Sequence, residues 1–122
     1  MSNRIQTKHL TLLKDDEAWM YYYTLLHEFQ WTDGIKNTRK ACHYEMGTWD
    51  LLDKLIIQSI KNLYDKSETE FILGVYMNFY RDGNDHAPAH SHPKQKQVII
   101  SLGATRTLQI GTKHYNMKNG DI

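Results

Sequence analysis

Cysteine is nearly absent from this sequence, because Cys42 is the only one in 122 residues. A single thiol can build neither an internal disulfide framework nor a thiolate zinc site, and it suits a reducing compartment. Long apolar runs are missing too: none approaches the roughly 20 residues that span a bilayer, and the N-terminus lacks a signal-peptide pattern. These absences predict an intracellular protein, in the cytoplasm or the nucleus, with neither a leader nor a membrane segment.

The chain also lacks a strong charge of either sign. It has 15 Lys and Arg residues against 14 Asp and Glu residues, a net charge of +1. Bulk electrostatics therefore neither demand nor exclude a polyanionic partner, and nucleic-acid binding would need a local patch of cations. A hydrophobic share of 40% is typical of a folded chain, and this length leaves room for one domain.

Two segments in the first half of the chain have helical spacing. After about ten polar residues that suit a strand or a loose arm, one helix opens at Asp15-Asp16-Glu17, where the helix dipole favours acids. The other runs from about Thr48 to Tyr64, and the segment between them, Ile35 to Gly47, is polar and basic without a clear period. Apolar residues mark one face of each helix: Trp19, Tyr22, Tyr23, Leu26 and Phe29 in the first, and Leu52, Leu55, Ile56, Ile60 and Leu63 in the second.

From Phe71 onward the period of the pattern changes from helical to two. The run from Phe71 to Tyr80 predicts a long strand, Val98 to Leu102 a short one, and Thr105–Ile110 with Lys113–Met117 a hairpin around Gly111-Thr112. Helices followed by short strands indicate an α+β arrangement, in which the helices buttress a sheet or barrel.

Histidines cluster in the loop that follows the long strand. His86, His90 and His92 fall within seven residues, and Pro88 and Pro93 bracket the last two. In an extended segment, residues i and i+2 point to the same side, so the imidazoles of His90 and His92 can converge on one metal ion. The alternative is a polar surface loop that is rich in histidine.

Asn78 and Tyr80 show the same spacing at the end of the long strand. An amide and a phenol on one side of a strand can hydrogen-bond a small carboxylate ligand inside a barrel. The alternative is the ordinary polar face of a half-buried strand.

Taken together, these segments resemble a known family. The run Asn78-Phe79-Tyr80-Arg81-Asp82-Gly83-Asn84-Asp85 leads to His90-Ser91-His92 and then to Ile100-Ser101-Leu102-Gly103-Ala104-Thr105-Arg106. The order and spacing are similar to those of AlkB-like Fe(II)/2-oxoglutarate-dependent dioxygenases, in which an Asn-x-Tyr strand, a glycine turn, a His-x-Asp motif and a Ser-Leu-Gly-Ala-x-Arg strand follow one another. Gly120-Asp121-Ile122 resembles the family's Gly-Asp turn. The close match covers about Asn78 to Ile122, and the N-terminal part matches in layout alone.

The resemblance implies a fold and a set of roles. The fold is a single α+β domain over residues 1–122: N-terminal helices and a lid over 1–70, packed on a double-stranded β-helix (jelly-roll) core over 71–122 whose last strands are missing. His90 matches the first iron ligand, and Asn78 and Tyr80 match positions that hold the cosubstrate 2-oxoglutarate. The lid position falls around Arg39 to Tyr44, where Arg39 could contact a phosphate and Tyr44 could stack on a base; the alternative is a solvated loop.

Two departures from the family pattern matter. His92 stands where the family has a carboxylate ligand; a three-histidine iron site is chemically reasonable, but it carries one negative charge less. We take His92 as a metal ligand, since Asp82 and Asp85 precede His90 without the required spacing. The distal histidine and the arginine that pairs with 2-oxoglutarate are expected beyond Ile122, because His114 comes too early and Arg106 belongs to the preceding strand.

The expected function is therefore oxidative dealkylation of alkylated DNA or RNA bases, in a single strand or flipped out of a duplex, with Fe(II), 2-oxoglutarate and molecular oxygen. Three alternatives remain: an AlkB-like hydroxylase or demethylase of protein, a non-catalytic jelly-roll remnant or assembly subunit, and a cupin-like metal-binding module. The Asn-x-Tyr and Ser-Leu-Gly-Ala-Thr-Arg segments argue against the last.

Overall fold

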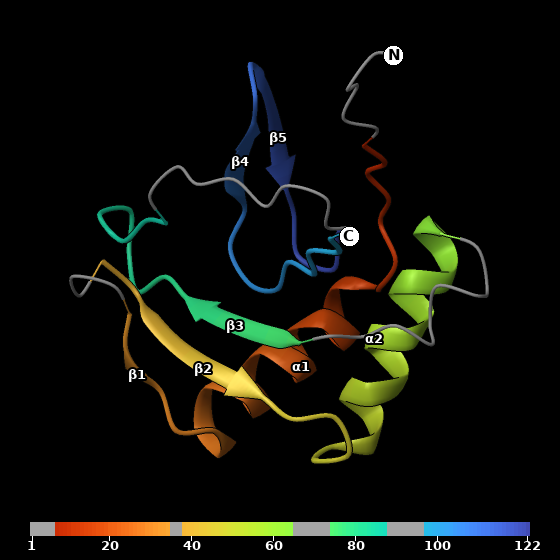
Figure 1. Cartoon of the computed structure of the whole chain (residues 1–122), viewed down its shortest axis with the longest axis vertical. Coiled ribbons are helices and arrows are strands. Elements are labelled where there is room, and N and C mark those ends of the chain that lie inside the picture. The colour runs from red at the N-terminus through yellow and green to blue at the C-terminus, as the bar shows by residue number, and fades with distance from the viewer. Residues whose placement is uncertain (1–6, 35–37, 65–73, 88–96) are drawn as a thin grey trace.

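The computed structural model describes residues 7–34, 38–64, 74–87 and 97–122. Within these ranges the chain forms two helices and two small antiparallel sheets (Figure 1). In chain order the elements are α1 (Asp15–Glu28), β1 (Thr32–Asp33), β2 (Lys40–Tyr44), α2 (Asp50–Leu63), β3 (Val75–Phe79), β4 (Arg106–Ile110) and β5 (Lys113–Met117). The two helices, β3 and the β4–β5 hairpin occur in the predicted order, whereas β1 and β2 lie between the helices, where no strand was predicted. Closure of the sheets into a double-stranded β-helix stays a prediction.

Both helices form where the sequence predicted them, but the buried side of α1 differs from the predicted face, because Tyr23 is 54% exposed. The first turn of α1 carries three acids beside the positive end of the helix dipole, and Ala18 and Tyr21 are its buried residues. In α2 the buried stripe consists of Leu52, Leu55, Ile56, Ser59 and Leu63. Neither helix of the described ranges is long and apolar enough to cross a membrane.

The three-stranded sheet has the order β1-β2-β3. Strand β2 pairs with β3 in an antiparallel register that sets Lys40 opposite Phe79 and Tyr44 opposite Val75. Burial alternates along β3, where Val75, Met77 and Phe79 are half-buried while Tyr76 and Asn78 are exposed. The predicted long strand is confirmed over Val75–Phe79, while Gly74 and Tyr80 lie outside the strand and residues 71–73 lie outside the described ranges.

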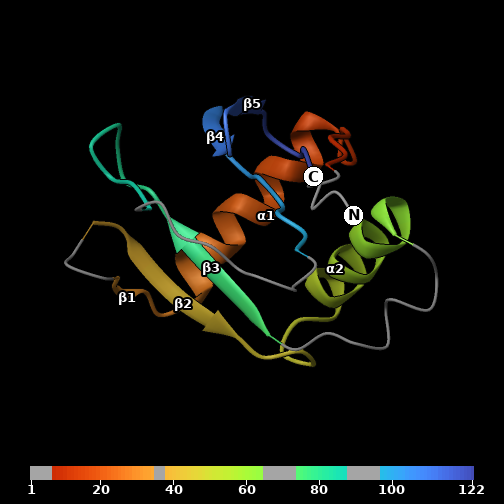
Figure 2. The same cartoon turned by 45° about the horizontal axis from the view of Figure 1, so that its top comes forward.

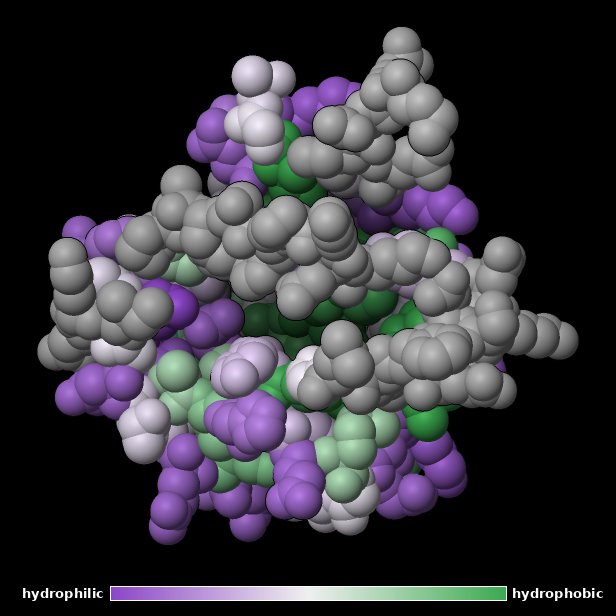
Figure 3. All heavy atoms as spheres, viewed as in Figure 1, coloured by the Kyte–Doolittle hydropathy of each residue, from purple (hydrophilic) through white to green (hydrophobic). Residues whose placement is uncertain are grey.

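The core forms where the two helices meet the inner face of this sheet. Its buried cluster joins Tyr21 of α1 and Tyr44 of β2 to Leu52, Leu55 and Ile56 of α2. On the face seen in Figure 3, apolar side chains gather at the centre of the molecule and polar ones surround them. Burial of these side chains supplies the main driving force that holds α1 and α2 against the sheet.

The β4–β5 hairpin stands apart from the three-stranded sheet in both Figure 1 and Figure 2. Its register pairs Arg106 with Met117 and Ile110 with Lys113, so the connection is the predicted two-residue turn, with Gly111 at φ 61°. This hairpin confirms the prediction to within one residue.

Residues at the two ends of the chain lie side by side. The backbone of Leu10 exchanges two hydrogen bonds with that of Ile122, at 2.8 and 2.9 Å, and Thr11 forms a bridge with Asp121. Ser101 also pairs with this end, because its N–H donates to Asp121 O at 2.9 Å and its carbonyl accepts from Gly120 N at 2.7 Å. The predicted strand over Val98–Leu102 is corrected here, since residues 97–102 form no strand and only Ser101 makes these ladder-like bonds.

Candidate functional site

The site begins at the C-terminal end of β3, where two predicted residues meet. The Nε–H of Arg39, which directly precedes β2, donates to the Oδ1 atom of Asn78 at 2.8 Å. The β2–β3 register brings them together, because Ala41 lies opposite Asn78 and Arg39 follows on the same side of the sheet. Arg39, which was expected to contact nucleic acid, thus contacts Asn78, which was expected to hold the cosubstrate.

Tyr80 lies two residues further along and contacts a different cation. The guanidinium carbon of Arg106 sits 4.1 Å from the centre of the Tyr80 ring, which is within the range of a cation–π interaction. Within the described residues, neither the Tyr80 hydroxyl nor the Asn78 side-chain N–H₂ group has a hydrogen-bond partner. Two unused donors at i and i+2 suit a carboxylate, so this donor set fits 2-oxoglutarate.

The loop after Tyr80 is held by its own charged side chains. Arg81 donates to the Asp85 carboxylate through Nε at 2.7 Å, through Nη2 at 3.0 Å and through its backbone N–H at 2.8 Å. Asp85 is only 7% exposed, and these bonds lower the pKa of its carboxyl to about 2. The side chain of Asp82 accepts from Asn84 N at 2.8 Å, so both acids serve the loop itself.

The loop continues towards the predicted metal motif. The backbone N–H of His86 donates to Thr38 O at 2.9 Å, which ties the loop to the start of β2. His90 and His92 lie outside the described residues. Within the described ranges, no group of three His, Cys, Asp or Glu side chains is placed to hold a metal, and the iron site stays a prediction.

The position of Tyr44 corrects one expectation from the sequence. Its side chain is 2% exposed and belongs to the core cluster. The hydroxyl lies 2.6 Å from Asp53 Oδ1 and accepts from Trp49 N at 3.0 Å. A ring enclosed in this way offers no face to a nucleobase, so Tyr44 fastens the end of β2 to the start of α2 instead.

Arg81, Asp85 and Arg106 are the residues that sequence reasoning did not assign to the site. The Arg81–Asp85 spacing around the Asp82-Gly83 turn was a usable signal, because opposite charges four residues apart can close a short loop. Arg106 carried no comparable signal, since its partners lie 21 to 26 residues earlier in the chain.

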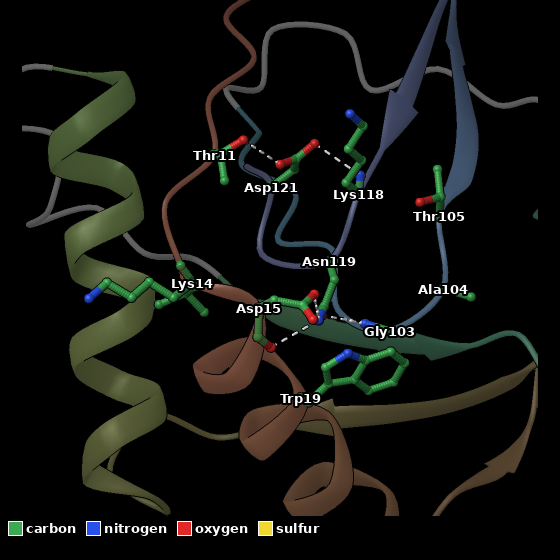
Figure 4. A pocket seen from close by; sticks show the side chains of 11 residues that line it. Thr11, Lys14, Asp15, Trp19, Gly103, Ala104, Thr105, Lys118, Asn119 and Asp121 are labelled. Carbon is green, nitrogen blue, oxygen red and sulfur yellow. Dashed lines mark hydrogen bonds between the residues drawn. The ribbon is translucent and has the colours of Figure 1, made fainter.

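A second polar region lies near the chain ends (Figure 4). It surrounds an open cavity of about 590 Å³ whose lining includes Trp19, Gly103, Asn119 and Asp121. Asn119 accepts from Gly103 N at 2.8 Å and donates to Asp15 Oδ1 at 2.9 Å, so its polar atoms join three segments of the chain. The carboxylate of Asp121 is likewise occupied, by Thr11, His9 and the backbone N–H of Lys118. These side chains stabilise the fold.

Comparisons with known proteins add no identification. No protein-family model, no curated protein and no solved structure matches the chain.

Proposed function

We propose that the chain belongs to an AlkB-like Fe(II)/2-oxoglutarate-dependent dioxygenase that removes alkyl groups from nucleic-acid bases. The observation that carries the proposal is the ordered run of three motifs: Asn78-x-Tyr80, His90-x-His92 and the Ser-Leu-Gly-Ala-Thr-Arg segment that ends at Arg106. Under this proposal the chain is a single domain whose sheets belong to a jelly roll, and the lid lies before residue 71.

The described part of the chain supports this proposal at the cosubstrate end. The amide of Asn78 and the phenol of Tyr80 keep donors that no described residue uses, at a spacing that suits one carboxylate. Arg39 adds a cation beside Asn78, and its contacts within the described residues are the neutral oxygens of Asn78 and Thr38. A cation beside the amide of Asn78 favours an anionic ligand.

In the proposed site His90 and His92 hold the iron. A second histidine in place of a carboxylate leaves the metal with one negative charge less, so bound anions have a stronger attraction to it. Asn78 and Tyr80 orient 2-oxoglutarate, and Arg39 orients Asn78 or meets a phosphate of the substrate. With Fe(II) and 2-oxoglutarate bound, molecular oxygen would be the oxidant. One oxygen atom would enter succinate as 2-oxoglutarate loses carbon dioxide, and the other would hydroxylate an N-alkyl carbon, whose product releases an aldehyde.

The test is a turnover assay on the full-length gene product with a methylated single-stranded oligonucleotide. We expect succinate and formaldehyde in equal amounts, loss of both in His90→Ala, and no change in His114→Ala. His114 is the matched control, because it is an exposed histidine of β5 outside the proposed site.

Each alternative has its own outcome in this assay. Succinate coupled to a peptide substrate, with no salt-dependent binding of oligonucleotides, would replace nucleic acid by protein as the substrate class. No succinate with any substrate, under conditions where the protein is folded, would contradict the enzyme proposal and favour a non-catalytic member of the fold.

A further inference from the structure

Arg106, the first residue of β4, makes three contacts that leave the hairpin. Its Nη1 atom donates to Asp82 O at 3.1 Å and its Nη2 atom to Asp85 O at 2.6 Å, while the guanidinium lies over the Tyr80 ring. The backbone of Arg106 is fixed from the other side, because it pairs in register with the buried Met117 of β5. One side chain therefore connects the β4–β5 hairpin to both ends of the 80–85 segment.

The two arginines near this loop contact different acceptors in it. Arg81 takes the carboxylate of Asp85, and Arg106 takes the main-chain carbonyls of Asp82 and Asp85. In the described residues Arg106 has no carboxylate partner, since its contacts are two carbonyls and an aromatic ring. A planar guanidinium can stack on a ring and donate from its edge at the same time, whereas the ammonium of lysine cannot do both.

The contacts of Arg106 lie next to residues of the proposed dioxygenase site. Tyr80 is a proposed cosubstrate residue, and Asp85 precedes the proposed iron ligand His90 by five positions. We propose that Arg106 is a positioning residue for the dioxygenase site: it orients the Tyr80 phenol and fixes the 82–85 loop that follows Tyr80. The catalytic part of this inference rests on the proposed function, and the contacts themselves do not.

The first measurement needs no metal. In hydrogen–deuterium exchange of the full-length gene product, we expect Arg106→Gln to speed exchange in peptides covering 81–87 by about tenfold, because two charge-assisted hydrogen bonds to the loop are lost. Peptides of α2 serve as the folding control and should exchange as in the parent. Lys113→Gln is the matched variant, since it removes a cation from the same hairpin at the end far from Tyr80.

The second measurement is an anaerobic titration of the Fe(II)-loaded protein with 2-oxoglutarate, followed by its visible absorption band. Arg106→Gln should raise the dissociation constant of 2-oxoglutarate about tenfold, and Arg106→Lys should give a smaller increase because it keeps the charge over the ring. Where Arg106→Gln does not fold, Arg106→Lys carries both measurements.

Three results would overturn the inference. Unchanged exchange in 81–87 would show that the contacts do not hold the loop. Faster exchange with unchanged 2-oxoglutarate affinity would make Arg106 a structural residue only. An absorption band missing from the parent protein would refute the proposed function and the positioning role together, while the exchange data would still report on the contacts.

Discussion

Removal of one oxygen atom from the core, by Tyr44→Phe, tests the assignment of Tyr44 as a structural residue. The hydroxyl accepts from Trp49 N at 3.0 Å and lies 2.6 Å from Asp53 Oδ1, in a side chain that is 2% exposed. Phenylalanine fills the same space but leaves the Trp49 N–H and one Asp53 oxygen without this partner. Loss of a largely enclosed hydrogen-bonding group of this kind costs about 2 kcal/mol of the free energy of unfolding.

The assays are urea unfolding, which gives the free energy of unfolding, and thermal melts, which give Tm, both followed by circular dichroism on the parent and the variant. For a chain of 122 residues, this loss corresponds to a fall in Tm of roughly 6–10 °C. Tyr23→Phe is the matched control, because Tyr23 is 54% exposed on α1 and should change the free energy of unfolding by less than about 0.5 kcal/mol. A Tyr44→Phe variant as stable as the parent would refute the structural role assigned to the Tyr44 hydroxyl.

Three further predictions concern stability. Gly103→Ala should cost roughly 2–4 kcal/mol, because φ is +89° and an added Cβ would lie 2.8 Å from Tyr22 Cε2; Gly83→Ala, with nothing within 4 Å, should be neutral in the same thermal melts. Burial, and after it the hydrogen bond to Asp53, raises the pKa of Tyr44 to about 12. The contribution of the Tyr44 hydroxyl to stability is therefore complete below pH 10 and should disappear as the pH rises from 10 to about 12. A parent and a Tyr44→Phe variant with the same alkaline unfolding profile would contradict this. Hydrogen bonds from Arg81 lower the pKa of Asp85 to about 2, so the stability that depends on its charge should be present above about pH 4 and be lost between pH 4 and 2, and acid titration of Asp85→Asn should lack that step.

Local patterns in the sequence were sufficient for the helices and the hairpin. The acids at Asp15 to Glu17 and the apolar stripe of α2 act within one element, and Gly111-Thr112 closes β4 on β5 across two residues. Interactions of this range depend on neighbours in the chain, so their signal is contained in short stretches of sequence.

Non-local pairing explains what the sequence did not reveal. Strand β2 shows no alternation, because Lys40 shares one face with the buried Tyr44 while Ala41 lies on the other, and it forms a strand by pairing with β3 more than 30 residues later. Val98 to Leu102 has strand-like residues, but within the described ranges only Ser101 of this segment makes ladder-like bonds, to Gly120 and Asp121.

In the candidate site, too, local sequence spacing was predictable and contacts between distant residues were not. The spacing of Asn78 and Tyr80 could be read directly from the sequence, and the family resemblance gave them a ligand. The contacts of Arg39 with Asn78 and of Arg106 with Tyr80 follow from strand register and from hairpin placement, which no short stretch of sequence encodes.

The most direct test of the central claim is an anaerobic absorption spectrum of the full-length gene product with Fe(II) and 2-oxoglutarate. We predict a visible metal-to-ligand charge-transfer band that is lost in His90→Ala, weakened in His92→Ala and in the double variant Asn78→Ala/Tyr80→Phe, and retained in His114→Ala. A protein that shows no such band, or that keeps it at full intensity in both His90→Ala and His92→Ala, would contradict the assignment of an iron and 2-oxoglutarate site to these residues.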